Sequence, residues 1–369
     1  MRTLVTLTLL ATACGGSPSA PRPARGGPAA PITVGTYAEL AVGPGNIAVL
    51  PDGRVIVSLH QFYAPPQPVV ELRDGQVVPF PDPAAYAQAG GPPLDSVLGI
   101  RADAMGVVWM LDNAMTRGGA RALVGWNPTA AKLERVVALG PPVTPPDAFL
   151  NDLAVDRARG AIYIADPAGG ANAAVIVVDL ATGKARRVLE GHASVIPEDL
   201  DLVIDGTPVA VKLPDGSRVR PHIGVNPIAL DAQAEWLYFG PMHGGTLYRV
   251  RTADLRDATL TPTVLGARVE VYAERPITDG IAIDAAGTIY LGDLARNAIG
   301  VIGPDRTYRV VATGPMLSWI DAFSFAPDGH VYVVANQLHR SATLNAGTDA
   351  TVPPFRILRF EPPGVRAER

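Results

Sequence analysis

Polar side chains recur at one position of a short phrase that is repeated along this chain. Each stands just before an apolar, β-rich run, which a tight turn joins to a second β-rich run; they are Asn46, Asn151, Asp152, Asn226, Asp279 and Asp321. Carboxylate and amide oxygens are the ligands that Ca²⁺ prefers, and they also accept hydrogen bonds from polar ligands. A carboxylate held away from water can in addition act as a general base.

The repeated phrase predicts the fold that would bring these residues together. Its clearest copy, residues 278–290, reads TDGIAIDAAGTIY, and weaker copies occupy 46–57, 98–110, 151–164, 226–239 and 321–333. Turns of the Asp-x-x-Gly type recur at about the length of one four-stranded unit, and helical periodicity is almost absent. Such repetition is typical of a β-propeller. We therefore predict an all-β fold, a six-bladed β-propeller.

The predicted propeller spans residues 32–362. We expect its blades near residues 44–81, 94–140, 150–191, 223–260, 277–314 and 319–360. Residues 192–222 lie between the third and fourth blades and belong to neither. Turns in this stretch, such as Pro214-Asp215-Gly216, predict a hairpin insert. We place the insert over one face of the disc, where it could act as a lid.

The innermost strand of each blade lines the central channel, so residues that precede these strands should meet at one mouth. We expect Asn46, Asp152, Asp321 and the neighbouring Trp319 to bind a ligand there, Trp319 by stacking on a flat group. Asp279 is the best candidate for a general base. The alternatives are that Asn and Asp cap their own turns, and that Trp319 packs between blades.

Composition narrows the classes of partner. The chain has 369 residues, 48% of them hydrophobic, and a net charge of −4, with no basic run that contains aromatic residues. This argues against nucleic acid as a partner. We find no nucleophile elbow, P-loop, dinucleotide fingerprint or zinc-type histidine spacing. We expect a monomer with a small-molecule ligand.

The N-terminus predicts export and a lipid anchor. Arg2 is followed by a short apolar run, and residues 10–14 read LATAC, which resembles a bacterial lipobox. We therefore predict a lipoprotein signal peptide over residues 1–13 and lipidation of Cys14, the chain's one cysteine. Residues 14–31, rich in Pro and Gly, would be a disordered tether, with the anchor as the membrane contact. The expected location is the bacterial cell envelope, at the outer membrane in a Gram-negative cell; the alternative is an ordinary secretory signal.

Several phrases between residues 90 and 360 resemble the yellow/major royal jelly protein family. Residues 108–113, VWMLDN, are similar to the family's LWVLDSG, and residues 161–166, AIYIAD, to AYISD. The segment LYFGPM at 237–242 is similar to LYFHPL, and WID at 319–321 with VANQL at 334–338 is similar to WPD and LWVLSNRL. The resemblance implies a six-bladed propeller that binds small molecules in its central channel. A few members of the family are associated with isomerisation of dopachrome-like substrates.

A more distant likeness, to the gluconolactonase/senescence-marker propellers, carries metal chemistry. The phrases LND at 150–152, VNP at 225–227 and TDG at 278–280 resemble that family's channel motifs. The likeness implies that Asn151, Asn226 and Asp279 hold Ca²⁺ or another divalent cation. The family's metal-binding glutamate has no counterpart, since Gly45 and Asn46 stand in its place.

Three functions remain open at this stage. The first is a lipid-anchored envelope propeller that binds a small polar or aromatic ligand in its channel. The second is a divalent-metal-dependent lactonase or esterase, in which Asp279 activates water. The third is a protein-interaction scaffold, since propellers serve many unrelated roles. The missing glutamate favours the first function over the second.

Overall fold

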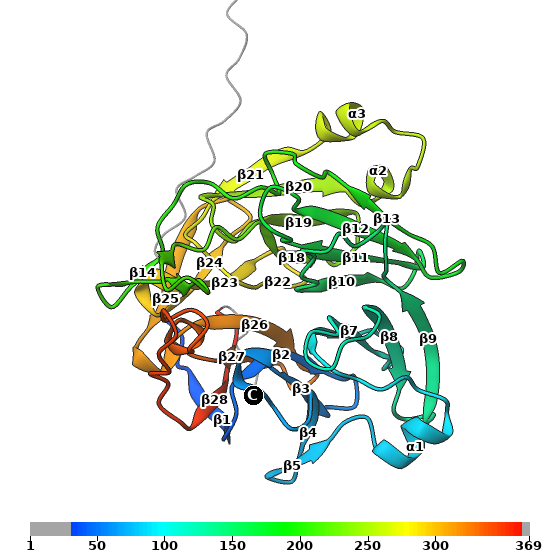
Figure 1. Cartoon of the computed structure of the whole chain (residues 1–369), viewed down its shortest axis with the longest axis horizontal. Helices are drawn as coiled ribbons and strands as arrows, with labels where there is room; N and C mark the ends of the chain where they lie inside the picture. Colours follow the sequence, from blue (N-terminus) through cyan, green and yellow to red (C-terminus); the bar gives the residue numbers. More distant parts are fainter. Residues whose placement is uncertain (1–30, 364–369) are drawn as a thin grey trace, which may run out of the picture.

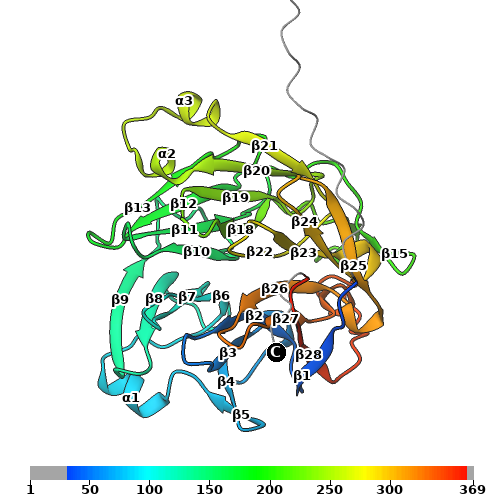
Figure 2. The same cartoon turned by 180° about the vertical axis from the view of Figure 1, so that it is seen from behind.

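The computed structural model describes residues 31–363, and over that range the chain forms six four-stranded antiparallel sheets (Figures 1 and 2). Their innermost strands contact one another in order around a ring, and contact between the first and the last of these strands closes it. The predicted six-bladed β-propeller is therefore confirmed. The signal peptide (1–13), Cys14 and the tether up to residue 30 lie outside the described residues.

The first three blades follow the chain from the innermost strand outwards. Blade 1 consists of β2 (Pro44–Val49), β3 (Val55–Leu59), β4 (Val69–Arg73) and β5 (Gln76–Pro79). Blade 2 consists of β6 (Val97–Ala102), β7 (Val108–Asp112), β8 (Ala122–Asn127) and β9 (Lys132–Ala138). Blade 3 consists of β10 (Leu153–Asp156), β11 (Ala161–Asp166), β12 (Ala174–Asp179) and β13 (Ala185–Val188).

Blades 4 and 5 keep the same order. Blade 4 consists of β18 (Val225–Leu230), β19 (Trp236–Pro241), β20 (Thr246–Arg251) and β21 (Glu270–Glu274). Blade 5 consists of β22 (Ile281–Ile283), β23 (Ile289–Asp293), β24 (Ala298–Ile302) and β25 (Tyr308–Thr313). Blade 4 thus extends beyond the predicted range 223–260. The reason is that α2 (Thr252–Arg256) and α3 (Pro262–Gly266) separate its outer two strands.

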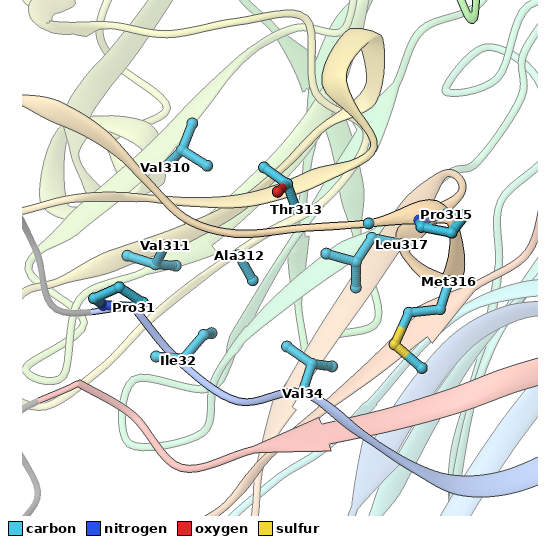
Figure 3. A pocket seen from close by; sticks show the side chains of 11 residues that line it. Pro31, Ile32, Val34, Val310, Val311, Ala312, Thr313, Pro315, Met316 and Leu317 are labelled. Atoms are coloured by element: carbon cyan, nitrogen blue, oxygen red, sulfur yellow. The ribbon is translucent and has the colours of Figure 1, made fainter.

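Blade 6 is completed by the beginning of the described chain. It consists of β26 (Ile320–Phe325), β27 (Val331–Ala335), β28 (Phe355–Phe360) and, outermost, β1 (Gly35–Leu40). The predicted range 319–360 therefore contains three of the four strands, because the fourth comes from the other end of the chain. Just before β1, the Ile32 amide donates to the Val311 carbonyl of β25 at 3.0 Å, so the segment links blades 5 and 6. An apolar groove of about 680 Å³ follows this junction (Figure 3).

The repeated Asp-x-x-Gly turn is held by its own aspartate. In blade 5, Asp284 Oδ1 accepts hydrogen bonds from the amides of Ala286 and Thr288, and Gly287 takes the left-handed φ of 82° that closes the turn. The other carboxylate oxygen, Oδ2, accepts the Tyr290 hydroxyl at 3.2 Å. One residue therefore both closes the hairpin and attaches it to the buried second strand.

The core lies between neighbouring blades. Between blades 2 and 3, for example, Trp109 and Leu111 pack with Ile162, Ile164 and Ile176, all completely buried. Apart from α2 and α3, the helical pieces are α1 (Pro83–Gln88) and single 3₁₀ turns at Gln61–Tyr63, Leu294–Arg296, Pro315–Leu317 and Leu338–Arg340. Within the part of the chain that the structure describes, no helix is long and apolar enough to cross a membrane.

The insert forms two small hairpins, of which the first contacts the 3₁₀ turn Leu294–Arg296 of blade 5 and lies towards the left edge of Figure 1. The first pairs β14 (Val203–Ile204) with β15 (Thr207–Pro208), and the second pairs β16 (Val211–Lys212) with β17 (Arg218–Val219). Its buried side chains, among them Leu202 and Ile204, pack in one cluster with Met242, Trp319 and Leu338. Since Trp319 directly precedes the innermost strand of blade 6, the insert packs beside the mouth where the ring residues were expected.

Candidate functional site

A cavity of about 330 Å³ opens at this mouth of the channel. Ring residues from blades 3 to 6 line one part of it, namely Asn151, Asn226, Asp279 and Asp321. Aromatic and apolar side chains line most of the rest, including Phe62, Phe149, Met242, Trp319, Leu338 and Leu344. Val211 of the insert contributes as well. The cavity therefore combines a polar cluster near the channel axis with apolar walls.

The residues predicted from the gluconolactonase likeness touch one another. Asn226 Nδ2 donates to Asp279 Oδ1 at 2.6 Å, while Asn226 Oδ1 accepts a hydrogen bond from Asn151 Nδ2. Asn226 and Asp279 are each only 4% exposed. Gly280 makes this convergence possible, because a Cβ there would lie 1.7 Å from the Asp321 carbonyl oxygen. The Asp-Gly pair of the repeated phrase thus brings blades 5 and 6 into close contact beside the carboxylate.

Trp319 is the second hydrogen-bond donor to Asp279. Its indole Nε1 donates to Asp279 Oδ2 at 2.6 Å, so both carboxylate oxygens have a partner. The Trp319 ring is buried and stacks on His339, with ring centroids 5.9 Å apart and planes 10° from parallel. Its backbone has a φ of 57°, which is rare for a bulky residue. Residues with such strained backbones are concentrated at binding and active sites. Trp319 packs beneath the insert and lines the cavity.

Asp321 and Asp152 have different environments. Asp321 lines the cavity, and its Oδ2 accepts a hydrogen bond from Asn336 Nδ2 at 2.7 Å. Asp152 instead accepts hydrogen bonds from Asn46 Nδ2 at 3.2 Å and from the guanidinium of Arg101 at 3.3 Å. Neither Asn46 nor Asp152 contributes to the lining of the cavity, although both were predicted to bind a ligand.

Arg101 explains why those two residues lie apart from the cavity. Its guanidinium also donates to the carbonyls of Phe323 in blade 6 and Leu153 in blade 3. The side chain therefore ties together three blades across the channel. Asn46 and Asp152 belong to this cross-link, whereas Asn151, Asn226, Asp279 and Asp321 face the open mouth.

Burial dominates the electrostatics of the three aspartates. It raises the pKa of Asp279 to about 6, against hydrogen bonds from Trp319 and Asn226 that lower it. Burial also raises the pKa of Asp321 well above its usual range, and the nearby charges of Asp279 and Asp152 add to the shift. The pKa of Asp152 is raised by burial too, although Arg101 opposes this. Among residues 31–363, only Asp152 of the three has an ion-pair partner.

The described residues contain no group of three or more His, Cys, Asp and Glu side chains arranged to hold a metal ion. Asn151, Asn226 and Asp279 supply a single carboxylate, and they form a hydrogen-bonded chain in which the Asn226 amide nitrogen, not its oxygen, faces Asp279. As arranged, this trio does not fit a cation. The amide of Asn226 would have to turn before three oxygens faced one point.

His60 also lines the cavity, although it does not stand at the repeated ring position. Its Nδ1 accepts the Phe62 amide at 3.1 Å, and burial lowers the pKa of the imidazole to about 3. His60 is therefore neutral, with its proton on Nε2. Phe62 follows it in the loop between the second and third strands of blade 1, and loops at that position open on the same mouth as the ring. That topological rule could have found both residues.

The fold and the cavity define a six-bladed propeller with a ligand-sized pocket at one mouth of its channel. The family model of the major royal jelly proteins matches residues 95–361, well over half of the chain. The chain therefore belongs to the major royal jelly protein family, as the resemblance predicted. A search among curated proteins finds no significant match.

Solved structures with the same architecture are distant in sequence. A gluconolactonase from Xanthomonas campestris is 14% identical, with a TM-score of 0.56 over 91% of this chain and 97% of that one. A luciferin-regenerating enzyme is 12% identical, with a TM-score of 0.55 over 91% and 97%. The PQQ-bound form of an aldose sugar dehydrogenase from Streptomyces coelicolor is 16% identical, with a TM-score of 0.50 over 91% and 99%. At these identities the likeness establishes the fold alone.

Proposed function

We propose that this protein binds a small molecule at the channel mouth, and that the ligand combines an aromatic or apolar body with a positively charged or hydrogen-bond-donating group. The observation that supports this most is the pair Asp279 and Asp321, two buried carboxyl groups in the lining of a largely apolar cavity. Neither has a cationic partner among residues 31–363. A cation on the ligand would compensate the burial of these groups.

The cavity also supports an aromatic or apolar ligand body. Phe62, Phe149 and Trp319 offer ring surfaces, and Met242 offers an adaptable apolar contact. Neutral His60 adds one N–H donor for an acceptor on the ligand. Ligand pockets of this kind have mostly apolar walls and a few placed polar groups, and their usual volume is about 300 to 1,000 Å³.

Two ligands with the same body test the proposal by calorimetry at pH 7.5. We expect 2-phenylethylamine to bind at least about tenfold more tightly than 2-phenylethanol, since a desolvated charge pair contributes about 1.4 kcal/mol or more. Asp321→Asn should remove most of this preference, and Asn226→Ala should weaken both ligands. Asp74→Asn, at an exposed hairpin turn, is the control and should leave binding unchanged. Saturable binding by neither ligand, nor by catechols or sugars in the same assay, would contradict the proposal.

The alternative is a divalent-metal-dependent lactonase of the gluconolactonase type. It is supported by the position of Asn151, Asn226 and Asp279 at one mouth, where a cation would require the Asn226 amide to turn its oxygen towards Asp279, and by the raised pKa of Asp279, which suits a general base. For this alternative we expect Ca²⁺ to raise the melting temperature and to support hydrolysis of gluconolactone, and Asp279→Asn to abolish turnover. An unchanged melting temperature with Ca²⁺, Mn²⁺ and Zn²⁺ would exclude it.

We also propose that the propeller is held at the bacterial cell envelope by lipid on Cys14, with the channel mouth open to solutes outside the cytoplasm. Support comes from the lipobox-like LATAC sequence and the Pro- and Gly-rich stretch after it. The binding proposal does not depend on the anchor.

A further inference from the structure

A second pocket, remote from the channel mouth, lies between blades 3 and 4. It has a volume of about 540 Å³, and the turn between β10 and β11, the turn between β12 and β13 and the end of α2 enclose it (elements labelled in Figure 1). Those turns lie at the opposite end of blade 3 from Asn151, which precedes β10. The pocket therefore opens on the other face of the disc, away from Asp279 and the insert.

The lining of this second pocket is strongly basic. Four basic residues line it, Arg159, Lys184, Arg186 and Arg256, against the single acidic residue Asp179. Asp179 is engaged elsewhere, because its Oδ1 accepts hydrogen bonds from the amide and the hydroxyl of Thr182, which close the β12–β13 turn. This concentration of positive charge stands out in a chain whose net charge is −4.

Most of these cations lack a counter-ion. Arg159 pairs with Asp156 at 3.3 Å. Lys184, Arg186 and Arg256 form no ion pair with any residue in the range 31–363, whereas most arginines in that range have a carboxylate partner. Arg186 is half-buried, and one of its nitrogens donates to the Leu255 carbonyl of α2. Burial lowers the pKa of this guanidinium, with only a weaker opposing effect from Asp257, so its charge is poorly compensated.

From this geometry we infer a second binding site, for a phosphate group, formed by Lys184, Arg186 and Arg256. Guanidinium forks match the oxygens of a tetrahedral oxyanion, and a doubly charged phosphate would compensate two of the three unpaired cations. The volume admits more than the phosphate itself. A phosphorylated sugar and free inorganic phosphate share the chemistry that this site recognises.

Thermal unfolding of the full chain tests the site at pH 7.5, with phosphate replacing chloride at constant ionic strength. We expect 20 mM inorganic phosphate to raise the melting temperature of the wild type by about 2 °C or more. The double variant Lys184→Gln/Arg256→Gln should lose this shift; both side chains are exposed, so the fold should be retained. Lys212→Gln/Arg218→Gln, which removes the same two charges from the insert, should keep it.

The same melting-temperature measurement with glucose 6-phosphate, and with glucose as its phosphate-free control, distinguishes a phosphorylated sugar from free inorganic phosphate as the ligand. A larger shift with glucose 6-phosphate than with inorganic phosphate assigns the site to a phosphorylated sugar, and equal shifts assign it to phosphate alone. The inference is overturned if neither ligand shifts the wild type. It is also overturned if all three proteins shift equally, because that result reports the general stabilisation that phosphate exerts on folded proteins.

Discussion

At the scale of single residues, Asp279 carries the chemistry of the mouth. Its two oxygens accept hydrogen bonds from Asn226 and Trp319, each at 2.6 Å, yet its burial raises the pKa to about 6. Two donors hold the carboxylate in one orientation, and a third partner can approach only from the cavity. This combination suits a group that binds a cation or exchanges a proton near neutral pH.

The raised pKa of Asp279 has a consequence for stability. Because the folded pKa of about 6 exceeds the ordinary aspartate value of 3.8, the folded state binds the proton more tightly than the unfolded state. Asp279 should therefore contribute on the order of 1–3 kcal/mol more to the free energy of unfolding at pH 4 than at pH 7, whereas buried His60, whose pKa is lowered to about 3, acts in the opposite direction. Asp279→Asn should lose this contribution, so its free energy of unfolding should change with pH less favourably than that of the wild type on acidification, while Asp321 keeps its own contribution.

Urea denaturation at pH 7, 6 and 5 measures this effect. Asp74→Asn, at an exposed turn, should keep the wild-type dependence on pH. Identical slopes in wild type and Asp279→Asn would show that the carboxyl group titrates normally in the fold.

The ring residues could be predicted because their sequence position repeats. Asn151, Asn226, Asp279 and Asp321 each precede or begin an innermost strand, and propeller geometry brings such positions to one mouth. The sequence could not predict in the same way that Asp152 contacts Arg101 while the other ring residues line the cavity. Arg101 lies inside β6 without any repeated marker, and only the three-dimensional structure shows that it captures Asp152.

At the scale of elements, the insert borders the mouth, and its Val211 lines the cavity. Ile204 of β14 is 1% exposed and packs in the cluster that contains Trp319 and Met242, whereas its neighbour Val203 is 39% exposed. A short two-stranded hairpin is not stable alone. The insert is therefore held beside the mouth mainly by the few apolar side chains that it buries in this cluster.

Ile204→Ala should loosen the insert without unfolding the propeller. Replacing a fully buried isoleucine by alanine lowers stability by about 2–5 kcal/mol. Here we expect the substitution to destabilise the packing of the insert and not the blades. We expect faster amide hydrogen exchange in residues 202–211 and an unchanged exchange rate in the blade strands. Val203→Ala is the matched control, from which we expect no change. Equal acceleration in both variants would mean that burial at the cluster does not hold the insert.

Two blade limits illustrate where sequence patterns stop being informative. The range 223–260 ended too early because α2 and α3 interrupt blade 4 after β20, so β21 follows a stretch with no strand pattern. The range 319–360 lacked the outermost strand because β1 pairs with β28, with Gly35 opposite Arg359. Such a pairing between distant segments leaves no local signal, since both strands are ordinary alternating runs.

At the scale of the whole molecule, the described chain begins at the outer edge of the disc. Pro31 and Ile32 lie beside Val311 of β25, before the chain enters β1 (Figure 3). The described chain thus enters the fold at the outer strands of blades 5 and 6. Neither Pro31 nor Ile32 lines the cavity at the channel mouth.

The anchor is tested by Cys14→Ser in the full chain. Without the thiol no acyl group can be attached, so the protein should move from the membrane fraction to the soluble fraction. Wild-type ligand binding in the soluble variant would show that the propeller is intact. Unchanged membrane partitioning would contradict lipidation.

The pairing of Gly35 with Arg359 also determines the order of events during biosynthesis. β1 must wait for a partner that follows it by about 320 residues, so its edge stays unpaired until β28 has been synthesised. Contacts between such distant positions form slowly because a long loop must first close. We therefore expect the ring to close in one step, after β28 has been synthesised.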